Sequence, residues 1–175
     1  GFLVNAGHDP LRELPNNPRI QLLNELKGEL YRQWAGEPFD PLTFQTAIEY
    51  LRVKKPKLMF LSLGETDEWG HAGRYDEYLR SARRVDSYLQ QLWETLQADP
   101  EYAGKTTLIV STDHGRGVAP EKWKSHGEEV PGSELIWIMA LGPDTAPLGE
   151  RTNSADLGQN QIAATIAALL GEDYC

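Results

Sequence analysis

Several residue types that carry common protein chemistries are scarce in this sequence. The only cysteine is the last residue, Cys175, which excludes an internal disulfide and a thiolate metal site and argues against a cysteine nucleophile. No apolar run approaches the roughly 18 residues that a membrane-spanning helix needs. The longest apolar runs, Leu58–Leu63 and Leu135–Leu141, have the length of strands. The chain is therefore expected to have neither a membrane span nor a disulfide scaffold.

Basic residues are also in the minority. The 17 lysines and arginines are outnumbered by 26 aspartates and glutamates, which gives a net charge of −9. An acidic chain is not expected to bind nucleic acid in general, because such binding needs a basic face. A bound metal ion would still create a local cationic site. With 40% hydrophobic and 25% charged residues, the composition is that of a globular protein.

An initiator methionine and a signal-peptide pattern are both absent from the first residues, which read Gly-Phe-Leu-Val-Asn. We therefore expect the native protein to extend upstream of Gly1. The 175 residues suit one domain of ordinary size. We expect a single α/β domain over 1–175, with a helical lead-in at 1–57 and a core at 58–175.

Apolar patterning predicts alternating strands and helices. The expected strands are Phe2–Ala6, Leu58–Leu63, Thr106–Thr112 and Glu134–Leu141. The expected helices are Ile20–Trp34, a helix capped by Asp40 that runs through Leu51, Tyr75–Ala98, and Gln161–Leu170 after Asp156. Buried strands that alternate with amphipathic helices imply a layered α/β fold with helices on both faces of a sheet.

The residues of chemical interest follow the predicted strands. Asp67 and His71 lie four apart in the loop after Leu58–Leu63, and one helical turn would place both side chains on one side. Asp113 and His114 follow the next strand directly, and His126 lies in the loop before the last strand. Imidazole and carboxylate together suit Zn²⁺, Mn²⁺ or Fe better than Ca²⁺.

Each pair also has a simpler interpretation. An isolated D-x-x-x-H is more often a surface ion pair, Asp-His at a strand end serves equally as a turn with a helix cap, and a loop histidine is usually solvated. The three features gain weight together, because strand-end loops converge in a doubly wound sheet.

At these residues the chain resembles the alkaline phosphatase superfamily, which includes nucleotide pyrophosphatases/phosphodiesterases, sulfatases and cofactor-independent phosphoglycerate mutases. The matching features are D-x-x-x-H at Asp67 and His71, D-H-G at Asp113, and H-G at His126, in that order, followed by a similar closing helix. The resemblance covers about Leu58 to the end. It implies a three-layer α/β/α fold with a largely parallel central sheet.

The resemblance implies two divalent ions, with Zn²⁺ expected and Mn²⁺ or Mg²⁺ as alternatives. Asp67, His71 and His126 would bind one ion, and Asp113 and His114 the other. Such an enzyme hydrolyses small-molecule phosphate mono- or diesters, or sulfate esters, with a Ser or Thr nucleophile from an earlier segment. No residue of this chain matches that nucleophile, and we expect the chain alone to be weakly active or inactive. Relatives are often exported, which makes a periplasmic or secreted location the expectation of the resemblance alone.

Two alternatives stay open: a phosphosugar or phosphoglycerate mutase of the same superfamily, and a non-catalytic metal-binding module. Charged and aromatic neighbours of the expected ligands are candidates for substrate binding, although solvated charge or packing explains them as well. These candidates are Arg74, Arg116, Lys122, Lys124, Trp69 and Trp123. Glu65 and Glu68 add negative charge beside Asp67 and are candidates for supporting it. Gly115 and Gly117 are expected to let the backbone turn sharply.

Overall fold

The computed structural model describes residues 8–152 and 157–174. The chain forms two compact units, Gly1–Ala103 and Gly104–Cys175. This division does not coincide with the expected lead-in and core, and the single domain stays a prediction. The expected strand Phe2–Ala6 and the expected position of Asp156 lie outside the described residues. Within the described residues, no helix combines the length and the apolar character needed to cross a membrane.

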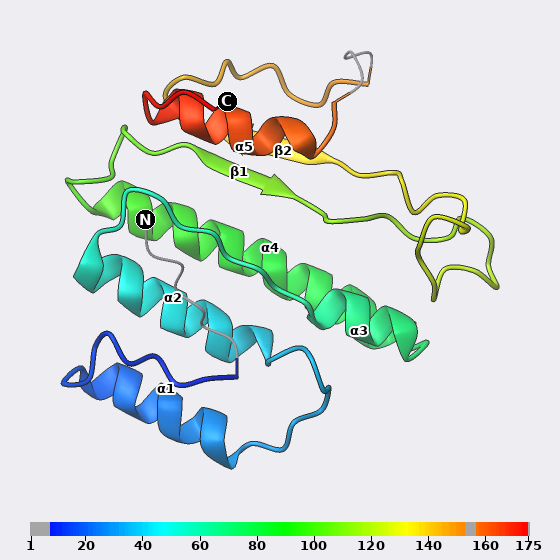
Figure 1. Ribbon diagram of the computed structural model, residues 1–175, viewed down its shortest axis with the longest axis horizontal. Helices are drawn as coiled ribbons and strands as arrows, with labels where there is room; N and C mark the ends of the chain where they lie inside the picture. The colour runs from blue at the N-terminus through cyan, green and yellow to red at the C-terminus, as the bar shows by residue number, and fades with distance from the viewer. Residues whose placement is uncertain (1–7, 153–156, 175) are drawn as a thin grey trace. The chain divides into compact units, whose positions relative to one another are not determined.

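The first unit is helical (Figure 1). It contains α1 (Pro18–Glu29), α2 (Asp40–Lys54), α3 (Glu65–His71) and α4 (Tyr75–Ala98). The Asn17 side chain caps α1 by accepting a hydrogen bond from the Ile20 N–H. This helix ends at Glu29, five residues before the expected Trp34, because Leu30 turns into extended backbone. The helix α4 has the bounds that its apolar period predicts.

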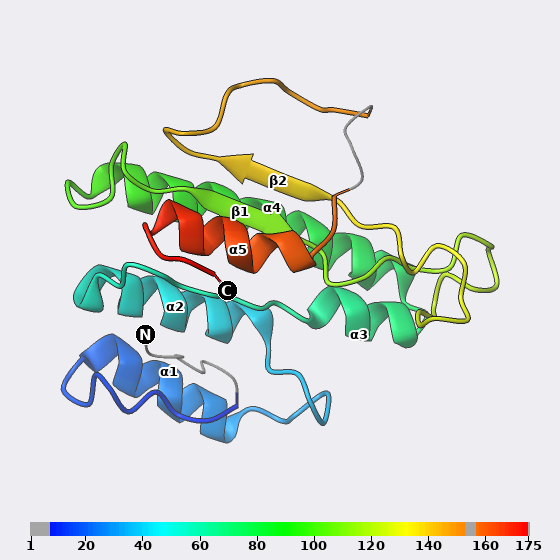
Figure 2. The ribbon, with the colours of Figure 1, turned by 45° about the horizontal axis from the view of Figure 1, so that its top comes forward.

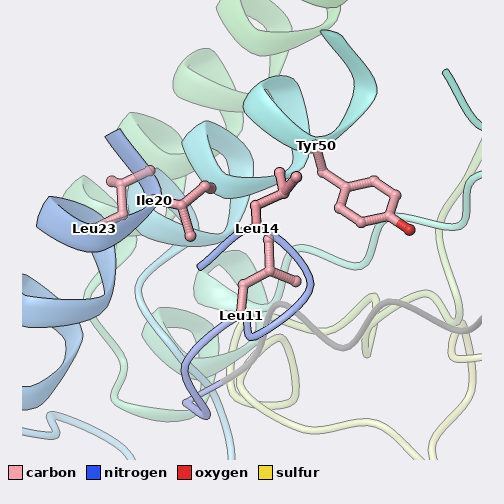
Figure 3. Close-up of a cluster of buried hydrophobic side chains, with 5 residues drawn as sticks. All are labelled: Leu11, Leu14, Ile20, Leu23 and Tyr50. Carbon is pink, nitrogen blue, oxygen red and sulfur yellow. The ribbon is translucent and has the colours of Figure 1, made fainter. Parts of the chain in front are cut away.

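Apolar side chains from the loop before α1, from α1 and from α2 close the core of this unit. Leu11, Leu14, Ile20, Leu23 and Tyr50 form one buried cluster (Figure 3). Phe44 of α2 is also buried and stacks on Tyr88 of α4, with ring centroids 4.0 Å apart. Burial of these groups stabilises α2 between α1 and α4.

The predicted strand Leu58–Leu63 is wrong: this segment runs from α2 to α3 without belonging to a strand. It was expected to be buried on both faces, yet Leu58 is 53% and Phe60 79% exposed. An apolar run becomes a strand only when neighbouring strands supply hydrogen-bond partners, and none is assigned in the described part of this unit.

The second unit contains β1 (Leu108–Ser111), β2 (Ile138–Leu141) and α5 (Asn160–Leu169). The two strands fall inside two of the expected strands, and α5 begins and ends within one residue of expectation. They pair antiparallel, with Leu108 opposite Leu141, and Figure 2 shows them side by side. An α/β fold is the coarse class of this chain, whereas the described sheet has these two strands and no parallel pair.

Candidate functional site

Two of the five expected ligands lie on α3 in the first unit. Asp67 and His71 are one helical turn apart, and His71 Nε2 lies 3.2 Å from Asp67 Oδ2. Both side chains are partly exposed, at 33% for Asp67 and 45% for His71. The expectation that a helical turn would bring this pair together is confirmed.

This pair has a spacing that a metal ion accepts. A tetrahedral Zn²⁺ with ligands about 2.0–2.1 Å away sets two ligand atoms about 3.3 Å apart, close to the observed distance. A charged hydrogen bond between i and i+4 side chains has a similar length. The donor set therefore fits a metal, and the geometry also fits the ion pair that the sequence leaves open.

The start of α3 is held by buried charged groups that sequence analysis placed differently. Asp40, expected to cap its own helix, is the first residue of α2, and its Oδ1 accepts hydrogen bonds from the N–H groups of Gly64 (2.9 Å) and Glu65 (3.3 Å). In return, the Asp40 N–H donates to Glu65 Oε1 at 3.0 Å, and Arg84 of α4 donates to Glu65 Oε2 at 2.6 Å.

Asp40 and Glu65 are each only 2% exposed. Burial, followed by repulsion from Glu65, raises the pKa of Asp40 to about 6, while Arg84 and the two backbone N–H groups oppose this shift. Glu65 was expected to support Asp67, and the structure instead places its carboxylate between α2 and α4. No sequence signal reports this network, because its members are 25 and 19 positions apart.

Two of the candidate substrate-binding residues, Trp69 and Arg74, lie on α3 and just after it. The Trp69 ring meets the edge of Trp34 with centroids 5.1 Å apart, and the Arg74 guanidinium lies 6.0 Å from the Trp69 ring. Arg74 also donates two hydrogen bonds to Asp76, which lower the pKa of that carboxyl to about 2. The candidate substrate-binding residues Arg74 and Trp69 thus contact each other.

The other three expected ligands lie in the second unit. The Asp113 side chain is exposed, and its Oδ1 accepts a hydrogen bond from the His114 N–H at 3.0 Å. His114 Nδ1 lies 2.8 Å from the Gly115 carbonyl, which can only accept, so Nδ1 carries the proton. In the neutral ring this leaves the lone pair on Nε2, the arrangement usual for a metal-binding histidine.

His126 lies directly against His114. Their rings stack with centroids 3.7 Å apart and an interplanar angle of 15°. Nε2 of His114 is also 3.6 Å from Asp113 Oδ2. The structure thus brings the five expected ligands together in two groups, one in each unit.

Gly115 and Gly117, which follow His114, were expected to let the backbone turn sharply, but the structure gives them a different role. Neither Gly115 nor Gly117 has a positive φ. A Cβ at Gly115 would overlap the carbonyl oxygens of Gly132 and Leu135, and one at Gly117 would meet the backbone of Lys122. Close approach of two backbone segments, rather than left-handed geometry, requires glycine here.

Gln159, which was not among the expected site residues, also holds the loop that carries Asp113. Its Nε2 donates to the carbonyls of Thr112 (2.7 Å) and Asp113 (2.6 Å), which ties the start of α5 to the end of β1. A polar residue 46 positions away gives no local signal of such a contact. Of the substrate-binding candidates in this unit, Arg116 donates to the Trp123 carbonyl at 3.3 Å, and Lys124 is exposed.

Comparison with known proteins places these residues in a family context. The sequence model of the family described as type I phosphodiesterase / nucleotide pyrophosphatase matches residues 15–141, a range that includes all five expected ligands. Two curated proteins named 2,3-bisphosphoglycerate-independent phosphoglycerate mutase are similar to this chain. The one from Haloarcula marismortui is 32% identical over 137 residues, which is 76% of this chain and 24% of that protein.

The second relative, from Haloquadratum walsbyi, is 26% identical over 114 residues, which is 65% of this chain and 21% of that protein. This chain therefore spans less than a quarter of the length of either mutase. No solved structure matches the chain.

Proposed function

We propose, from the fact that this chain belongs to the type I phosphodiesterase/nucleotide pyrophosphatase family of the alkaline phosphatase superfamily, that it supplies most of a two-metal centre for phosphoryl transfer. The substrate class is a small-molecule phosphate mono- or diester, with sulfate esters as a further option within the superfamily. The superfamily's three-layer fold with a largely parallel sheet is part of this proposal.

The family match over residues 15–141 carries the proposal, supported by the contact of Asp67 with His71 and by the stacking of His114 on His126. In this proposal, Asp67, His71 and His126 hold one ion, and Asp113 and His114 hold the other. Stacked rings at His114 and His126 suit ligands of two neighbouring ions, since paired catalytic ions lie about 3.5–4 Å apart.

Divalent ions, Zn²⁺ in the first place with Mn²⁺ or Mg²⁺ as alternatives, would neutralise charge on the phosphoryl oxygens. The chain's own residues hold and orient: the Gly115 carbonyl fixes the His114 ring, and the α3 turn sets Asp67 beside His71. Histidine binds a metal only in its neutral form, so metal affinity falls in acid. No residue of this chain is assigned as the nucleophile.

A second candidate is phosphoglycerate mutase chemistry, in which the phosphoryl group returns to the substrate. The names of both curated relatives favour it. Phosphorus NMR separates the two candidates: an esterase releases inorganic phosphate, whereas a mutase interconverts 2- and 3-phosphoglycerate without net release. Both reactions are to be assayed on this chain.

Calorimetric titration of the chain with Zn²⁺ and with Mn²⁺ tests the shared metal centre. We expect two ions per chain, and we expect His71→Ala and His114→Ala each to weaken binding about 100-fold or more. His8→Ala is the matched control, because His8 is the one histidine outside the two groups. Absence of near-stoichiometric binding, or equal affinity in all three variants, would contradict the proposal.

A further inference from the structure

We infer that the buried Asp40 carboxylate is a positioning residue for the metal centre, because it fixes the first turn of α3 and thereby the orientation of Asp67 and His71. This inference rests on the proposed function and adds residues that the five-ligand set does not contain. Asp40 and Glu65 are each only 2% exposed. Burial of a charged group costs free energy unless hydrogen bonds and opposite charge compensate it, so the contacts of these two carboxylates require an explanation.

The contacts are directed at the beginning of α3. The first N–H groups of a helix have no partner within the helix, and here the N–H groups of Gly64 and Glu65 donate to one oxygen of Asp40. No side chain at the cap position, Gly64, performs this role. A carboxylate at a helix start also interacts favourably with the helix dipole.

Glu65 fixes the same turn from the opposite direction. Its two carboxylate oxygens are used by different elements, Oε1 by the Asp40 N–H of α2 and Oε2 by Arg84 of α4. The turn is therefore held on both sides by charge-assisted hydrogen bonds, which are stronger than neutral ones. The helices α2 and α4, which supply these partners, are joined by the stacking of Phe44 on Tyr88.

The ligands lie close to this anchor along a short helix. Asp67 is two residues and His71 six residues from Glu65, within the seven residues of α3. A helix this short has little stability of its own, so its orientation depends on contacts at its ends. An error of about 1 Å in ligand placement is enough to reduce function strongly.

Variants of the whole chain separate positioning from general stability. Asp40→Ala removes the acceptor for the Gly64 and Glu65 N–H groups, whereas Asp40→Asn keeps an oxygen at the same place. The matched control is Thr46→Ala, because Thr46 is equally buried in α2 but its hydroxyl bonds to the Leu42 carbonyl within the helix. Zn²⁺ affinity is measured by calorimetry at a temperature where all variants are folded.

We expect Asp40→Ala to weaken Zn²⁺ binding about 10-fold or more, Asp40→Asn to restore most of it, and Thr46→Ala to leave it unchanged. Hydrogen exchange of the metal-free chain gives a second readout: the α3 amides lose protection in Asp40→Ala and keep it in Asp40→Asn. Wild-type affinity and wild-type α3 protection in Asp40→Ala would overturn the inference.

The metal-free readout keeps the inference separate from the proposed function. If the wild-type chain binds no Zn²⁺, the proposed metal centre fails, and the exchange data alone decide on the anchor. Loss of α3 protection in Asp40→Ala but not in Thr46→Ala then supports the anchor. Equal protection in both variants rejects it.

Discussion

The two units hold their expected ligands by different physical means. In the first unit, Asp67 and His71 lie on α3, whose start is fixed by hydrogen bonds of the buried Asp40 and Glu65 carboxylates. This unit also has a cluster of buried apolar side chains. In the second unit, Asp113, His114 and His126 lie in loops fixed by backbone carbonyls and by tight glycine packing. Among its described residues, no apolar side chain is fully buried.

Different interactions set the geometry of the expected ligands in each unit. A packed core resists small changes in volume, so a helix that is anchored to it keeps its direction. Loops that are held by a few hydrogen bonds and one or two closely packed glycines lack this support, and they open locally at low free energy. We therefore expect Asp67 and His71 to be pre-formed in the metal-free chain. Bound metal should instead stabilise the loops that carry Asp113, His114 and His126.

The largest effect is expected from Phe44→Ala in the first core. Removal of this stacked, buried ring should cost about 3–5 kcal/mol of the free energy of unfolding of that unit. Val118→Ala in the second unit is the control: Val118 is 73% exposed, and its loss should cost less than about 0.5 kcal/mol. Hydrogen exchange at increasing urea concentrations measures the loss in free energy of unfolding for each variant. Equal losses in the two variants would contradict the difference in core packing between the units.

The next largest effect is expected in how the free energy of unfolding depends on pH, and Asp40→Asn tests it. Because burial raises the pKa of Asp40 from 3.8 to about 6, the folded state binds its proton more tightly than the unfolded state. The stability that this group contributes is therefore fully present below about pH 4 and falls by up to about 3 kcal/mol as the pH rises to about 6.

Two charged groups face the Asp40 carboxyl: Glu65 raises its pKa further, and Arg84 opposes the rise. The Asp40→Asn variant has no carboxyl at this position and therefore lacks this pH dependence. The wild-type chain should thus lose stability relative to Asp40→Asn between pH 4 and 6. Thermal unfolding of both proteins across this range measures the difference. A constant difference in melting temperature would contradict the buried charge.

A smaller effect is expected from Gly115→Ala in the second unit. The added methyl group would overlap two carbonyl oxygens, and such overpacking costs about 1–3 kcal/mol. Hydrogen exchange should show faster exchange around His114 and leave the α3 amides unchanged. The control is Gly28→Ala in α1, where nothing lies within 4 Å, and a gain of about 0.5–1 kcal/mol is expected. Faster exchange in α3 would show that the two units are not independent.

The smallest effect is expected from Gln159→Ala. The variant loses two exposed hydrogen bonds to the Thr112 and Asp113 carbonyls, worth about 1 kcal/mol together. Amide chemical shifts near Asp113 should change, with at most a few-fold loss of metal affinity. Gln90→Ala, in which only a contact to Glu94 on α4 is lost, is the matched control. Identical spectra near Asp113 in the two variants would remove Gln159 from the site.

Local signals in the sequence predicted most helices and the residue types of the site. The apolar period gave the bounds of α4, and Gly171 with its positive φ follows the predicted end of α5. The first helix was expected at Ile20–Trp34, and α1 begins two residues earlier, at Pro18, and ends five residues earlier, at Glu29. The one-turn spacing of Asp67 and His71 predicted their contact.

Long-range contacts account for what the sequence did not predict. The run Leu58–Leu63 has strand composition, but strand formation depends on partners elsewhere in the chain. Asp40 carries the signature of a cap, and only the approach of α3 shows that it serves a different helix start. Gln159 and Arg84 act across tens of positions, where periodicity and spacing give no information.

Anomalous X-ray scattering from crystals of the chain grown with Zn²⁺ would locate bound ions and so test the proposed two-metal centre. We expect two adjacent peaks, one bound by Asp67, His71 and His126 and the other by Asp113 and His114. The two-metal proposal would be contradicted if no peak appeared, or if the ions bound elsewhere while Asp67 and His71 stayed paired only with each other.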